Sequence, residues 1–233
     1  MGDGNLGQLM DELVSNPGYI DGRRRFPRTF TAADAVAATE LLHEQIDKAC
    51  DARAGSARGR GLKIACEAGC NFCCEQPVMI FLPEAVRIAA WLARPENQEA
   101  RRAFLEAYPS WKERAGDGFD RIAAARGEAQ FAAHLEQWRK KVMCAFNRDG
   151  LCGIYPVRPS LCRTAHAVGS NERCDGANYQ GELPIPAPYP ALERYVEYAR
   201  TLDRAMHHAL GGEKNRKRAL CEQVYRLISD GQL

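Results

Sequence analysis

The sequence predicts a mainly α-helical fold, a single helical domain with irregular cysteine-rich loops. Several segments carry apolar residues at helical spacing. No alternating stretch is long enough to build a sheet. Residues 143–190 are rich in proline and lack sustained periodicity, so a loop region within the helical domain is expected there.

The chain is expected to begin with a flexible arm, followed by the helical cysteine-cluster domain. Residues 1–30 are poorly patterned, whereas residues 31–233 carry the helical patterns and the cysteines. Thr31 is a good N-cap, and apolar residues at helical spacing continue from it to Cys50, so a helix is expected over 31–50. The glycines in 52–61 predict a flexible linker after it.

The later helices are delimited by proline and glycine. Pro83 suits a first helical turn, because the N–H that it lacks would be unpaired there. Breaks are expected at Pro109 and at Gly116-Asp117-Gly118. The predicted helices are 83–94, 96–107, 110–115, 119–142, 192–210 and 215–228.

Ten cysteines are the most distinctive feature of the composition, and eight of them form two groups. The first group has four thiols within nine residues, which can converge on one small volume with little loop-closure cost. Thiolates are soft ligands that suit a thiophilic metal, here zinc or an iron–sulfur cluster. The candidate metal ligands are Cys66, Cys70, Cys73 and Cys74 in the first group, and Cys144, Cys152, Cys162 and Cys174 in the second.

Net charge and the lack of long apolar runs bear on the expected partners and cell compartment. A net charge of +2 gives no electrostatic case for nucleic acid. The chain shows neither a secretory signal nor an apolar run that would span a membrane, so a cytoplasmic protein is expected. Thiols stay reduced in that compartment, which favours metal ligation over disulfides.

The adjacent pair Cys73-Cys74 carries a further inference. Neighbouring side chains point in different directions in a strand and in a helix, so these two thiols do not easily bind one ion together. They suit two separate centres, or two metals of one cluster. Four thiolates fit both a tetrahedral zinc and an iron–sulfur cluster, so the metal and the division of the eight cysteines stay open.

Residues near the two groups, and the two isolated cysteines, also carry predictions. Asp149-Gly150 is a tight-turn signal that would bring Cys144 and Cys152 together. His166 is a minor candidate for completing a three-cysteine site. Cys50 and Cys221 lie inside helical patterns and are expected to be small core residues. Arg158 and Arg163 suit either charge compensation at the thiolates or ordinary ion pairs.

The segments CEAGCNFCC and CAFNRDGLCGIYPVRPSLCR resemble the YkgJ-type CxxCxxCC cysteine-cluster family of zinc- or iron-chelating domains. The resemblance covers about residues 62–175. Besides the motif cysteines, it includes Ile154-Tyr155, Arg158-Pro159 and Arg163. Ala145 and Asn147 depart from the family pattern, in which proline and leucine usually follow the cysteine. The resemblance implies a cysteine-ligated metal.

Three functional classes remain open. A structural zinc module would pin the loops onto the helices, and an iron–sulfur or metal-handling protein would have a redox role. Resemblance to the flagellin lysine methylase, which has a similar cysteine cluster, adds S-adenosylmethionine-dependent protein lysine methylation as an alternative. The expected partners are a metal ion and a protein partner or substrate, with neither nucleic acid nor membrane. Whether the protein is an enzyme, and which residues would be catalytic, the sequence leaves undecided.

Overall fold

The structure is a computed structural model that describes residues 31–178, 200, 202–204 and 217–230. The expected arm 1–30 and most of the helix predicted over 192–210 lie outside these residues. The helices are α3 (Ala32–Gly59), α4 (Leu82–Leu92), α5 (Gln98–Ala115), α6 (Gly118–Ala124), α7 (Gly127–Arg139), α8 (Ser160–Thr164) and α10 (Leu220–Ser229). Short 3-10 turns lie at Phe72–Cys74, Pro95–Asn97, Tyr155–Val157 and Glu172–Cys174.

The predicted mainly α fold is confirmed. The described strands are two residues long: β1 (Met79–Ile80), β2 (Asn147–Arg148), β3 (Leu151–Cys152) and β4 (Arg218–Ala219). They form two antiparallel pairs, β1 with β4 and β2 with β3. None of the described helices is both long and apolar enough to cross a membrane.

The first helix is longer than predicted. α3 continues to Gly59, so the flexible linker expected over 52–61 was wrong for all but its last residues. The segment after Cys50 contains three alanines, among the best helix formers, and Ala57 is 4% exposed. Local helix propensity and this burial outweigh the cost of the isolated glycines.

Pro109 does not break its helix, because α5 runs through it from Gln98 to Ala115. The aromatic residues Phe104, Tyr108 and Trp111 form the buried face of this helix. Packing of that face against the core outweighs the hydrogen bond that proline removes. Conversely, the helix expected over 119–142 is divided into α6 and α7, with extended backbone at Ala125 and Arg126.

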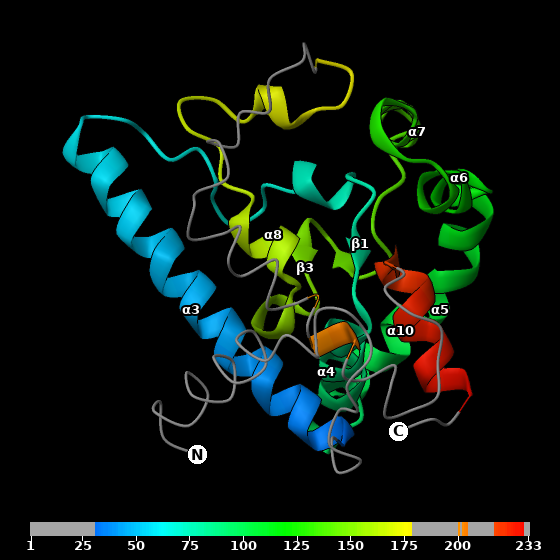
Figure 1. The fold of residues 1–233 in the computed structure, drawn as a ribbon. Coiled ribbons are helices and arrows are strands. Elements are labelled where there is room, and N and C mark those ends of the chain that lie inside the picture. Colours follow the sequence, from blue (N-terminus) through cyan, green and yellow to red (C-terminus); the bar gives the residue numbers. More distant parts are fainter. Residues whose placement is uncertain (1–30, 179–199, 201, 205–216, 231–233) are drawn as a thin grey trace.

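The core lies where α4 packs against both α3 and α10. α3 lies along one side of the molecule and α5, α6, α7 and α10 along the other, with β1, β3 and α8 between them (Figure 1). Tyr108 of α5 stacks on Tyr225 of α10 at 3.8 Å between ring centroids. β4, which directly precedes α10, pairs with β1, which follows the first cysteine group. This strand pair joins α10 to the cysteine region.

Candidate metal centre

The first cysteine group lies in an irregular segment that ends in a 3-10 turn. Gly69 has a φ of +89°, in the left-handed region that glycine tolerates, and this turns the backbone immediately before Cys70. The amide of Cys70 donates to the carbonyl of Glu67 at 3.1 Å. Gly69 therefore permits the turn that leads into Cys70.

Distant segments bring Cys66 and Cys70 to the end of the second group. The residues before Cys66 pair with 167–169, and the amide of Ala167 donates to the Cys66 sulfur at 3.1 Å. Asn171 Nδ2 donates to the Cys70 sulfur at 3.5 Å. Burial, together with the charges of Cys66 and Cys70, raises the pKa of Cys174 to about 11. These three thiols thus share one neighbourhood.

The second group begins in a tight hairpin. Asp149 and Gly150, with φ of +50° and +84°, form the turn between β2 and β3, as the sequence predicted. The amide of Gly153 donates to the carbonyl of Phe146 at 2.8 Å, which closes the hairpin behind Cys152. A Cβ on Gly150 would lie 3.5 Å from the carbonyl oxygen of Gly69. The turn therefore packs directly against the first cysteine segment.

The remaining cysteines of the second group gather around Cys74. The amide of Cys144 donates to the carbonyl of Cys74 at 2.8 Å, which joins the two segments through their backbones. Burial raises the pKa of Cys162, and the negative charges of Cys144, Cys152 and Cys74 raise it further. Burial also raises the pKa of Cys152 to about 11. Cys74, Cys144, Cys152 and Cys162 thus act on one another.

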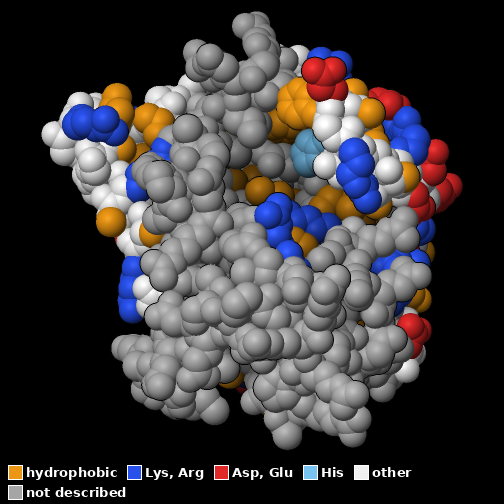
Figure 2. Space-filling model, in the orientation of Figure 1, with side chains coloured by type: hydrophobic (Ala, Val, Ile, Leu, Met, Phe, Trp, Pro, Cys, Tyr) orange, Lys and Arg blue, Asp and Glu red, His pale blue; other side chains and the backbone are white. Residues whose placement is uncertain are grey.

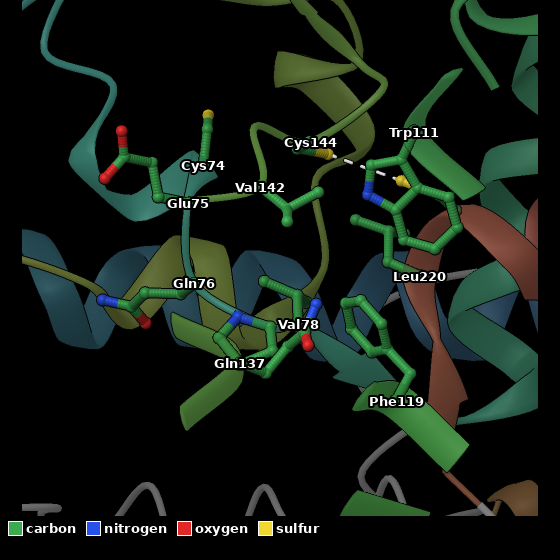
Figure 3. Close-up of a pocket in the computed structure, with 12 residues that line it drawn as sticks. Cys74, Glu75, Gln76, Val78, Trp111, Phe119, Gln137, Val142, Cys144 and Leu220 are labelled. Atoms are coloured by element: carbon green, nitrogen blue, oxygen red, sulfur yellow. Dashed lines mark hydrogen bonds between the residues drawn. The ribbon is translucent and has the colours of Figure 1, made fainter. Parts of the chain in front are cut away.

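A small cavity joins this second neighbourhood to the hydrophobic core. Its volume is about 20 Å³, room for about one water molecule. Cys74, Cys144 and Cys221 line it together with Trp111 and Val142. In Figure 3 the sulfur of Cys144 points toward the sulfur at position 221, and the dashed line marks their contact of 3.6 Å.

Cys73 lies between the two neighbourhoods. The neighbouring thiol of Cys74 raises the pKa of Cys73, and Cys73 in turn lowers the pKa of Cys74. The charges of Cys74, Cys162 and Cys70 also raise the pKa of Cys73, so thiols from both neighbourhoods act on it. Asn147, one of the departures from the family pattern, also lowers the pKa of Cys74.

The donor set fits zinc or iron chemically, since eight thiols from the two groups lie in two adjoining neighbourhoods. Among the residues that the structure describes, no three cysteine, histidine, aspartate or glutamate side chains have the mutual geometry of a metal site. Backbone hydrogen bonds bring the two cysteine groups together. The cysteine sulfurs in the described residues are not arranged around a common point.

A buried polar network fixes the loop that carries Cys162. Glu84 of α4 is 6% exposed and accepts a hydrogen bond from the amide of Ser160 at 2.7 Å. His43 of α3 lies 3.4 Å from the same carboxylate oxygen, Nε2 to Oε1, and its Nδ1 accepts from Arg87. This network ties α3 and α4 to the start of α8. The sequence reading missed it, because these residues lie far apart in the chain.

The two arginines of the motif have separate roles. Arg163 is 5% exposed and donates to the carbonyls of Pro156 and Arg158, both at 2.7 Å, and to Asp47 of α3. It therefore acts as a structural tie between the loop and α3. Arg158 lies over the ring of Tyr155, 4.2 Å from the centroid.

His166 and the two isolated cysteines lie in different surroundings. His166 is half-buried, burial lowers its pKa, and the charges that act on it come from Arg158 and from residues of α3. Cys50 and Cys221 are 7% and 2% exposed, so their predicted place in the core is confirmed. The contact of Cys221 with Cys144 was not foreseen, because its helical pattern signals burial and gives no information about its neighbour.

A family of known proteins matches the part of the chain that carries both cysteine groups. Residues 65–180 match the family model CxxCxxCC, described as a "putative zinc- or iron-chelating domain". The matched segment contains all eight cysteines of the two groups and leaves out Cys50 and Cys221. No curated protein and no solved structure matches the chain.

Proposed function

Since the chain belongs to the CxxCxxCC family of zinc- or iron-chelating domains, we propose that it holds zinc or iron through two cysteine centres. The first centre comprises Cys66, Cys70, Cys73 and Cys174, and the second comprises Cys74, Cys144, Cys152 and Cys162. The observations that carry this division are contacts: Ala167 and Asn171, which precede Cys174, donate to the sulfurs of Cys66 and Cys70. The amide of Cys144, by contrast, donates to the carbonyl of Cys74.

The vicinal cysteines support two centres. Cys73 is assigned to the first centre because its neighbour Cys74 is joined to Cys144, which belongs to the second. Adjacent residues diverge in direction, so the pair suits a bridge between two sites better than one shared ion. The thiol of Cys73 becomes a thiolate on binding, since a coordinated thiol loses its proton.

The proposed role of the metal follows from the loop region that it would cross-link. Residues 144–178 contain only short regular elements, yet they pack against α3, α4 and the first cysteine segment. Eight thiolates would cross-link this region, so a structural role is proposed for zinc. An iron–sulfur cluster in the same ligands would add a redox role.

The test is metal analysis and visible spectroscopy of the full chain purified without oxygen. Zinc bound to a colourless protein would support the structural role. Iron with acid-labile sulfide and a brown colour would support the redox role. A folded protein without zinc or iron would contradict the proposal, and Cys50→Ser serves as a matched control because this buried thiol lies outside both groups.

Methylation of protein lysines by S-adenosylmethionine stays the alternative function. The strand pairs in the described part of the chain are antiparallel and two residues long, without the strand and glycine-rich loop typical of nucleotide binding. A rise in melting temperature on adding S-adenosylmethionine would favour this alternative.

A further inference from the structure

A second, much larger cavity lies beside the cysteine centres. Its volume is about 660 Å³, within the range of small-molecule binding sites. The wall on one side is the segment from Gln76 to Phe81, which follows Cys74, and on the other side it is formed by α6 and α7. Leu161, which precedes Cys162, and two basic residues, Arg200 and Lys217, complete it.

The cavity has an apolar floor and an apolar rim. Ile122, Trp138 and Phe81 are buried beneath it. Phe131 and Leu161 line it although they are 52% and 40% exposed, and they are among the few large hydrophobic side chains exposed in the described residues. A hydrophobic ligand would remove these two side chains from water, and apolar burial is the main favourable contribution to binding in such sites.

The charged residues of the lining have one sign. Arg126, Arg200 and Lys217 line the cavity, and the described lining residues include no aspartate or glutamate. The ammonium of Lys217 lies 4.8 Å from the centroid of the Phe81 ring, above the apolar floor. Figure 2 shows basic and hydrophobic side chains gathered with a histidine around a hollow in this face.

Two acidic groups outside the described lining, Glu84 and Asp203, are already bound by protein donors. Glu84 and Asp203 act electrostatically on Lys217 from outside the lining. Glu84 accepts from the amide of Ser160, and Asp203 Oδ1 accepts from the amide of Leu82 at 3.0 Å. Each of these carboxylates thus accepts a hydrogen bond from the backbone.

We propose that this cavity binds a small organic anion, a carboxylate with an aliphatic or aromatic body. The apolar body lies against Phe81, Phe131 and Leu161, and the carboxylate is held by the basic residues, since hydrogen bonds between ionised groups are the stronger ones. Binding of such an anion is a function separate from metal binding, and it does not depend on which metal is bound. Because Gln76 and Leu161 are close in sequence to Cys74 and Cys162, the ligand would bind next to the proposed second centre.

The test is calorimetric titration of the full, metal-loaded chain with three eight-carbon probes of different charge. Octanoate is expected to bind with a Kd below about 1 mM, and octylammonium and 1-octanol at least about tenfold more weakly. No heat of binding from octanoate at about 1 mM would overturn the proposal. Equal affinity for octylammonium would also overturn it, because the basic lining would then contribute nothing.

Variants locate the site. Lys217→Gln and Arg126→Gln should each weaken octanoate binding about tenfold, the usual order for losing a hydrogen bond to a charged group. Arg102→Gln is the matched control, because it makes the same charge change on an exposed side chain of α5 that does not line the cavity. Equal affinity in the two lining variants and the control would place the octanoate elsewhere and contradict the proposal.

A filling substitution tests the cavity itself. Ala123→Trp places a large side chain in the lining and should abolish octanoate binding at an unchanged thermal midpoint. Undiminished binding in that variant would overturn the site, and if it fails to fold, the two charge variants still decide. Metal analysis of the same samples separates this result from the metal proposal, since each can fail alone.

Discussion

The sulfur of Cys144 lies 3.6 Å from the sulfur of Cys221, although 77 residues separate them in the chain. A disulfide bond is about 2.05 Å long, so this is a contact between two thiols. Cys144 belongs to the second cysteine group, and Cys221 lies in the first turn of α10. The contact therefore joins the cysteine region to the C-terminal helix.

This contact predicts different results for the two cysteines. Cys144→Ala should remove metal from the second proposed centre, because it deletes a ligand. Cys221→Ala should keep the metal content and lower the free energy of unfolding by about 1 kcal/mol, typical of a small change in a packed core. Metal analysis and urea unfolding measure both quantities, and equal metal loss in the two variants would assign Cys221 to the centre.

The division of the thiols predicts that each centre can be emptied separately. Cys70→Ser should remove the metal of the first centre and Cys152→Ser that of the second, so each variant keeps about half of the metal of the unmodified chain. The double variant should bind none. The ratio of metal to protein is measured after gel filtration, and complete loss of metal from either single variant would show that all the thiols form one cluster.

His43 predicts how stability depends on pH. Burial lowers the pKa of His43, and protonation of Nδ1 would break its hydrogen bond from Arg87. The unfolded state therefore binds more protons than the folded state below the unfolded pKa of about 6.5, and stability falls as the pH falls through that range. Above it, this contribution is fully present.

His43→Gln removes that dependence. The difference in unfolding free energy between the unmodified chain and the variant should shrink as the pH falls from 7.5 to 5.5, by at most about 1.4 kcal/mol per pH unit. Loss of metal at low pH affects both proteins and cancels in the comparison. Guanidinium unfolding at several pH values measures the difference, and a constant difference would mean that His43 does not titrate on unfolding.

The hairpin turn predicts a local cost. Gly150→Ala places a side chain at a φ of +84°, which costs about 1 kcal/mol or more, and points its Cβ toward the carbonyl of Gly69. Both the free energy of unfolding and the affinity of the second centre should fall. Gly55→Ala is the control, because Gly55 lies within α3 with open space around it and alanine favours a helix. Equal destabilisation of both variants would contradict the role of the turn.

Local information in the sequence determined the fold class, the cysteine groups and several short elements. The helical spacing predicted α4, and Asp149-Gly150 predicted the hairpin, because a turn of this kind depends on neighbouring residues alone. Where two local signals conflicted, the predicted helix boundaries were wrong. Glycines predicted a linker where alanines and a buried face extend α3, and Pro109 predicted a break that aromatic packing prevents.

Contacts between distant segments decided the arrangement of the site. The sequence left the eight thiols undivided, because spacing along the chain does not say which loops meet. The pairing of the residues around Cys66 with 167–169, and of Cys74 with Cys144, depends on the whole fold. The same holds for the network of Glu84 and His43, whose burial comes from the packing of α3 on α4. Residue types thus specify the chemistry that is available, and tertiary packing determines which residues share it.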